Sequence, residues 1–186
     1  MSTRDLVHIA LFAAIVASLG LIPPLTLGLI PVPITAQSLG VMLAGAILGS
    51  RRGGLALLVF VLLVAIGLPV LAGGRGGLGV FFGPSGGFVL AFPIAAFVIG
   101  ALIERFWDRL GFFTAFASIL AGGIGVMYAI GVPWLAAAGG LSLGQAMVGS
   151  AAFLPGDCIK AAVAALICVT IKRAYPVIRP GHAGHG

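Results

Sequence analysis

The sequence predicts an all-α integral membrane protein with six transmembrane helices and cytoplasmic N- and C-termini. Three observations support this fold class. First, 61% of the 186 residues are hydrophobic and only 8% are charged, whereas soluble domains carry about 25% charged residues. Second, apolar segments recur along the chain, each close to the length of about 17–25 residues that a span requires. Third, basic residues concentrate in every second connection, which places most of them on one side of the membrane.

The first expected helix, 6–22, follows a basic N-terminal segment and approaches the length of a full span. Because similar apolar segments follow it, we interpret it as a retained helix rather than a cleaved signal peptide. A break rich in proline leads to the second helix, 34–50. Only Arg51 and Arg52 separate that helix from the third, which is expected at 53–72.

The fourth helix is expected at 86–103 and the fifth at 110–128, with the charged segment ERFWDR between them. The sixth is expected at 153–171. We interpret 129–152 as an outer connection with room for a short helix at the membrane interface. A seventh span at 132–149 would carry the C-terminal basic residues to the outer side, against the positive-inside tendency.

This topology makes one side of the membrane strongly basic. Eight of the ten Lys and Arg residues become cytoplasmic: Arg4, Arg51, Arg52, Arg105, Arg109, Lys172, Arg173 and Arg179. The net charge of +6 therefore reflects membrane orientation, and no nucleic-acid partner is predicted. The chain has no convincing internal repeat, so we expect a single domain over 1–186.

Three charged residues remain outside the cytoplasmic connections: Arg75, Asp157 and Lys160. Pro155 suits a first helical turn, so Asp157 lies where the positive end of the helix dipole favours an anion. Lys160, three residues later, shares its helix face. A charge inside the bilayer costs about 2.5–3.5 kcal/mol on insertion scales and usually faces an interior cavity. A binding site is indicated, although a purely structural ion pair remains the alternative.

The outer loop around Arg75, GGRGGLGVFFGPSGG, is rich in glycine, which permits positive φ angles. It is either a flexible connection or a lid whose Phe81 and Phe82 cover an apolar ligand. Gln37 opens the second span and needs a hydrogen-bonding partner, either among the lipid headgroups or in the site. Tyr128, Trp134 and Phe88 add aromatic surface to the same outer half.

These residues together suit a small ligand with an acid group, a neutral hydrogen-bonding end and an apolar middle. Arg75 or Lys160 would hold the acid, and Asp157 would accept hydrogen bonds from N–H donors. No metal site is predicted, because His182 and His185 on the terminal segment GHAGHG form a poor one, and no cofactor is expected.

The segments VPITAQSLGVMLAGAILGSRRG (32–53), GLPVLAGGRGGLGVFFGPSGGF (67–88) and FLPGDCIK (153–160) resemble the BioY family of biotin transporters. These are the substrate-binding S components of energy-coupling factor transporters. The resemblance covers nearly the whole chain in order and spacing. It implies an S-component fold of six transmembrane helices in the cytoplasmic membrane, with biotin bound near the outer face.

By this resemblance, Asp157 and Lys160 match the polar pair on the last helix that contacts biotin, and Arg75 falls in the ligand-covering loop. We assign the ureido end of biotin to Asp157. Whether Lys160 meets the ureido carbonyl or the carboxylate stays open, and we favour Arg75 for the carboxylate. Gln37 and Phe82 complete the predicted substrate-binding set.

The resemblance also implies partners: a membrane coupling protein and two cytoplasmic ATPases. In the first helix, Ala10 with Ala14 and Ala13 with Ala17 resemble the docking surface for the coupling protein, or they serve ordinary small-residue helix packing. No phosphate-binding motif GxxxxGK[ST] occurs in the chain, so ATP would be hydrolysed by another polypeptide. The oligomeric state, including a homo-oligomer, stays open.

Three alternatives compete with biotin uptake. The chain could be an S component for a different vitamin such as thiamine or riboflavin, against which the GPSGG loop and the PGDxxK helix start argue. It could be an intramembrane enzyme with Asp157 and Lys160 as acid and base, although no His or Glu accompanies them at membrane depth. A purely structural subunit would have no need of three charges on the outer side.

Overall fold

The computed structural model describes residues 1–25, 31–174 and 177–178. The predicted cytoplasmic residue Arg179 and the histidines His182 and His185 lie outside this range. Helices are the main regular structure of the described residues, and turns and loops join them; the β pairings among these residues are isolated bridges, Leu25 with Ile34 and Leu71 with Arg75. The elements are α1 (Thr3–Leu19), α2 (Gln37–Leu48), α3 (Ser50–Ala65), α4 (Gly79–Phe82), α5 (Gly86–Arg105), η1 (Trp107–Arg109), α6 (Phe112–Leu120), η2 (Ala121–Val126), α7 (Met127–Gly139), α8 (Leu143–Ala151) and α9 (Leu154–Ala174).

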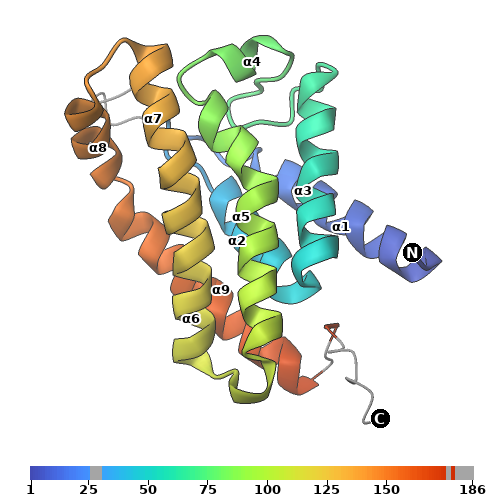
Figure 1. The fold of residues 1–186 in the computed structure, drawn as a ribbon. Coiled ribbons are helices and arrows are strands. Elements are labelled where there is room, and N and C mark those ends of the chain that lie inside the picture. Colours follow the sequence, from blue (N-terminus) through green and yellow to red (C-terminus); the bar gives the residue numbers. More distant parts are fainter. Residues whose placement is uncertain (26–30, 175–176, 179–186) are drawn as a thin grey trace, which may run out of the picture.

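The helices form a bundle around α2. In Figure 1, α3, α5 and the continuous rod of α6 and α7 stand side by side, while α1 and α9 cross behind them obliquely. The short helix α2 packs against α1, α3, α5 and α9. Its buried positions include Met42, Val41 and Leu48, which are shielded from solvent on all sides. Because α2 is central and short, its N-terminal end lies inside the bundle rather than at the surface.

The fifth predicted helix is longer than expected. Helical structure runs from Phe112 to Gly139 without a break, so the assignment of 129–152 to an outer connection is wrong for its first half. Pro133 lies within α7, as membrane helices tolerate when neighbouring groups satisfy the backbone. The helix ends at Gly140, whose left-handed φ of +64° suits glycine. The short helix expected beyond it is present as α8.

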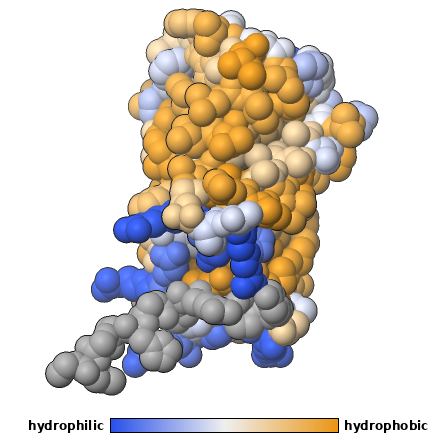
Figure 2. Space-filling view, turned by 90° about the vertical axis from the view of Figure 1, so that its right-hand side faces the viewer, coloured by the Kyte–Doolittle hydropathy of each residue, from blue (hydrophilic) through white to orange (hydrophobic). Residues whose placement is uncertain are grey.

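Three helices are long and apolar enough to cross a membrane among the described residues: Gly86–Arg105, Phe112–Gly139 and Leu154–Ala174. The first three predicted spans appear as shorter helices, α1 with 17 residues, α2 with 12 and α3 with 16. Figure 2 shows an apolar surface over most of one face, with hydrophilic residues gathered at one end. The chain is a multi-pass membrane protein.

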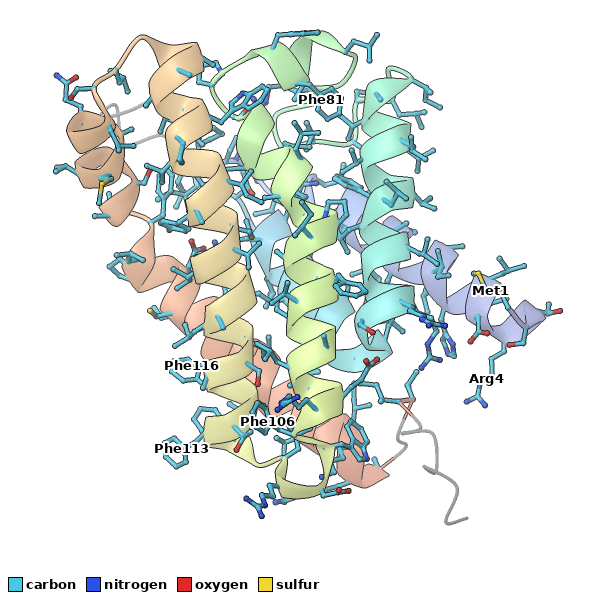
Figure 3. All side chains as sticks on the ribbon, in the orientation of Figure 1. Met1, Arg4, Phe81, Phe106, Phe113 and Phe116 are labelled. Atoms are coloured by element: carbon cyan, nitrogen blue, oxygen red, sulfur yellow. The ribbon has the colours of Figure 1, made fainter. Side chains whose placement is uncertain are left out.

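The molecule has two chemically different ends. One, the basic end, gathers the N-terminal part of α1, the junction between α2 and α3, and the C-terminal ends of α5 and α9. Arg52 demonstrates this, because it bonds both Asp5 Oδ1 (3.5 Å) and the Val177 carbonyl (3.0 Å). The other, the cavity end, carries α4, α8 and the outer loops. Figure 3 shows Phe81 at the cavity end and Phe106 and Phe113 toward the opposite end.

Candidate functional site

A cavity opens at the cavity end, among α2, α5, α7, α9 and the segments before α2 and α5. Its empty space, counted together with its open mouth, is about 580 Å³. Nine of its lining residues are apolar and eight have a polar group: Val32, Pro33, Ile34, Thr35, Gln37, Ser38, Leu71, Arg75, Ser85, Phe88, Val89, Phe92, Met127, Tyr128, Phe153, Asp157 and Lys160. The structure thus brings together Arg75, Asp157, Lys160 and Gln37, as the sequence predicts.

Asp157 is the buried anion of this cavity, with only 6% of its surface exposed. Its Oδ1 lies 2.9 Å from Lys160 Nζ and 3.3 Å from Ser38 Oγ. Its Oδ2 accepts a short hydrogen bond of 2.7 Å from the Tyr128 hydroxyl. Since a carboxylate offers about four acceptor positions, three donors leave it short of saturation. The less occupied oxygen is Oδ2.

Lys160 has its full set of partners. Its ammonium lies 2.9 Å from the Thr35 carbonyl, 2.9 Å from Ser38 Oγ and 2.9 Å from Asp157 Oδ1. An ammonium has three N–H donors, so each of them has an acceptor within the protein. A ligand carboxylate at Lys160 would have to displace one of these bonds.

Arg75 has donors to spare. Its Nε donates to the Ala72 carbonyl (3.2 Å) and its Nη1 to Ser85 Oγ (3.0 Å). A guanidinium carries five N–H donors, and within the described residues the remaining ones have no protein acceptor. Partial burial lowers the pKa of Arg75 below its ordinary value, but arginine remains charged in proteins. Arg75 therefore has N–H donors available at the cavity.

Glycine geometry shapes the loop that carries Arg75. Gly73, Gly74 and Gly77 have φ angles of +79°, +69° and +88°, in the region that glycine adopts without steric cost. The positive φ angles expected in this loop are confirmed. The sequence did not predict the single helical turn α4 within it.

Gln37 lines the cavity, but its amide is occupied. Nε2 donates to the carbonyls of Val16 (3.1 Å) and Val70 (3.0 Å), and Oε1 accepts from the Ala72 N–H at 2.9 Å. The residue is 1% exposed. It joins α1, α2 and the loop before Arg75, so its partners are backbone groups rather than lipid headgroups.

Phe82 lies away from the cavity lining and is 80% exposed. Phe81 is half-buried and packs against the core. The loop after α4 is held by Trp134, whose Nε1 donates to the Gly83 carbonyl at 3.1 Å. Sequence reasoning also missed Ser38, Thr35 and Ser85. Their signal was weak, because small hydroxyl residues beside a helix start are common without any ligand.

The four alanines of α1 do not share one environment. Ala10 and Ala14 are exposed, Ala17 is half-buried, and Ala13 is buried in the core. The pair Ala10 and Ala14 therefore lies on an accessible face, whereas Ala13 serves packing against the bundle.

Comparison with known proteins assigns the family. The model of the BioY family matches residues 1–177. The chain belongs to the BioY family. The biotin transporter BioY of Rhizobium etli is 54% identical over 183 residues, which cover 96% of this chain and 98% of that protein. The probable biotin transporter BioY of Bacillus subtilis is 48% identical over 170 residues, 91% of each chain.

The fold also matches a solved structure. The S component for biotin from an ECF-type ABC transporter superposes with a TM-score of 0.88 at 33% identity, covering 93% of this chain and 95% of that one. BioY proteins are transporters by name, so the intramembrane-enzyme alternative is set aside.

Proposed function

We propose that this BioY protein is the biotin-binding S component of an energy-coupling factor transporter in the cytoplasmic membrane. Its single domain crosses the membrane six times, with both termini in the cytoplasm. The protein takes part in the uptake of biotin across this membrane. The family, the curated relatives and the fold all support this function. What the geometry adds is a match between the cavity and the ligand.

The unused donors of Arg75 carry the proposal. The cavity holds two cations, Arg75 and Lys160, and one anion, Asp157. It therefore has a net charge of +1, which suits a monoanion such as biotin. Because Lys160 already has three acceptors, the valerate carboxylate binds Arg75, directly or through water. The ureido N–H groups then face Asp157 Oδ2, and Phe88, Phe92 and Met127 line the apolar space between.

Calorimetry on the purified chain tests this function. Biotin should bind, and desthiobiotin should bind because it keeps the carboxylate and the ureido group. Thiamine, a cation, should not bind a cavity with a net positive charge. Binding of thiamine in preference to biotin would favour an S component for a different vitamin.

The proposed partners are a membrane coupling protein and two cytoplasmic ATPases. The exposed pair Ala10 and Ala14 offers a close-packing face on α1, as small residues do between membrane helices. Ala14→Phe should therefore prevent co-purification of the partner subunits while biotin binding persists. Ala117→Phe, at an exposed alanine of α6, is the matched control and should retain the partners.

A further inference from the structure

Tyr128 lines the cavity, and an irregular helical segment lies just before it in the sequence. Residues Ala121–Val126 form a π-helix within the long rod of α6 and α7. A π turn inserts an extra residue, which rotates all following side chains by about 100° relative to a continuous α-helix. Met127 and Tyr128, the next two residues, both line the cavity.

Two glycines allow this π segment to pack closely against neighbouring helices. A Cβ on Gly122 would approach Ile99 Cγ1 of α5 at 2.4 Å, and one on Gly123 would approach Met42 Cε of α2 at 2.7 Å. The π turn is thus packed directly against two helices. The segment directly before Tyr128 is therefore closely packed against α2 and α5.

The ring and the hydroxyl of Tyr128 have separate contacts. The ring meets Phe88 edge to face, with centroids 6.0 Å apart at 87°. The hydroxyl donates to Asp157 Oδ2 at 2.7 Å. The other oxygen, Oδ1, already accepts hydrogen bonds from Lys160 and Ser38. Tyr128 is therefore the group that fixes the orientation of the less occupied oxygen.

We infer that Tyr128 is a positioning and specificity residue, which orients Asp157 Oδ2 so that the site selects a ligand bearing an N–H donor there. This inference rests on the proposed binding of biotin. Without the hydroxyl, Asp157 keeps its charge and its bonds to Lys160 and Ser38, but its second oxygen loses the donor that orients it. Discrimination between ligands with and without that N–H should fall.

The test compares wild type and Tyr128→Phe with four ligands: biotin, desthiobiotin and the two biotin isomers that carry a methyl group on one ureido nitrogen. Phenylalanine keeps the ring contact with Phe88. Loss of the oriented bond should weaken biotin binding about 10-fold, the lower range for a hydrogen bond to a charged group. The preference for biotin over one of the N-methyl isomers should shrink by a similar factor. The ratio of biotin to desthiobiotin should stay constant, since both keep the ureido N–H groups.

Ser118→Ala is the matched control, because it removes a buried hydroxyl of α6 that donates to the Thr114 carbonyl and does not line the cavity. It should leave the discrimination against N-methyl biotin unchanged. Equal weakening of all four ligands by Tyr128→Phe, or unchanged binding, would overturn the inference. Failure of wild type to bind biotin at all would instead reject the proposed function.

A second comparison covers the case in which Tyr128→Phe does not fold. The double variant Tyr128→Phe/Asp157→Asn removes the carboxylate together with its donor, so that no charged oxygen is left underbonded. If Tyr128 acts through Asp157, this double variant should bind biotin with the same affinity as Asp157→Asn alone. A further loss of affinity in the double variant would show that Tyr128 acts independently of Asp157, which contradicts the inference.

Discussion

The cavity end and the basic end use the same residue types for different purposes. At the basic end, Lys172 donates to the Trp107 carbonyl and lies 5.2 Å from the centre of its ring, and Arg52 bonds two carbonyls and Asp5. These charges are used to hold helix ends together. At the cavity end, Arg75 has N–H donors without an acceptor among the residues that the structure describes, and it lines the cavity. The two ends therefore differ in unused hydrogen-bonding capacity next to a cavity, and charge alone does not distinguish them.

The largest expected effect concerns which end faces the cytoplasm. Most basic residues lie at the basic end, so that end should stay inside. A reporter fused after Gly186 should be active in the cytoplasm, and one inserted in the turn at Gly140 should be active outside. Activity of the Gly186 fusion only in the periplasm would invert the assignment of the two ends.

Asp157→Asn should have the largest effect on binding of the substitutions at the cavity end. Asparagine keeps the size and one acceptor but loses the negative charge that strengthens bonds from N–H donors. A hydrogen bond to a charged group contributes about 1.5–3 kcal/mol, so biotin affinity should fall about 10- to 100-fold. Calorimetry and thermal unfolding are measured on the same preparation. Normal affinity with a collapse of thermal stability would show that Asp157 only joins helices.

Arg75→Ala should reduce the preference of the site for an anionic ligand over a neutral one. Wild type should bind biotin more tightly than an uncharged biotin amide, and the variant should lose that preference, by about 10-fold or more. Arg109→Ala, at an exposed arginine of the basic end, is the control and should keep the preference. If Arg75→Ala weakens both ligands equally, the arginine orders the loop through Ala72 and Ser85 instead. If Lys160→Ala alone abolishes the preference, Lys160 rather than Arg75 holds the biotin carboxylate.

The sequence predicted the charged residues of the cavity because charges inside an apolar chain are rare and therefore conspicuous. Arg75, Asp157 and Lys160 were found in this way, and the structure places all three around one space. The occupied amide of Gln37 could not be predicted, since it depends on carbonyls from α1 and from the loop before Arg75. Nor could the π turn before Tyr128, which depends on packing against Met42 and Ile99.

The length of the fifth helix was missed for a related reason. Pro133 and the glycines around it suggest a break in a soluble protein, whereas the bundle and the membrane keep this segment helical. Helix positions were therefore predicted well where charged residues flank a span. They were predicted poorly where only glycine and proline mark its end.

The smallest effect on binding is expected from Glu104, the carboxylate at the basic end that matches Asp157. Glu104 accepts from Ser50 N–H at 2.8 Å and from Ser50 Oγ at 2.7 Å, so it stabilises the first turn of α3. The adjacent Gly49 has a φ of +83°, and a Cβ there would approach Glu104 Oε1 at 2.2 Å. Glu104→Gln keeps one acceptor and should cost about 1 kcal/mol, as loss of a helix cap does.

That cost should lower the melting temperature by about 2–4 °C in a chain of this size. The biotin affinity should stay within about twofold of wild type, because the bonds of Glu104 hold helix ends at the basic end and do not reach the cavity. Thermal unfolding and calorimetry of Glu104→Gln beside Asp157→Asn therefore compare the same chemical change at the two ends. If Glu104→Gln weakened biotin binding as much as Asp157→Asn does, the two ends would be coupled through the bundle, and the division between a binding end and a structural end would be wrong.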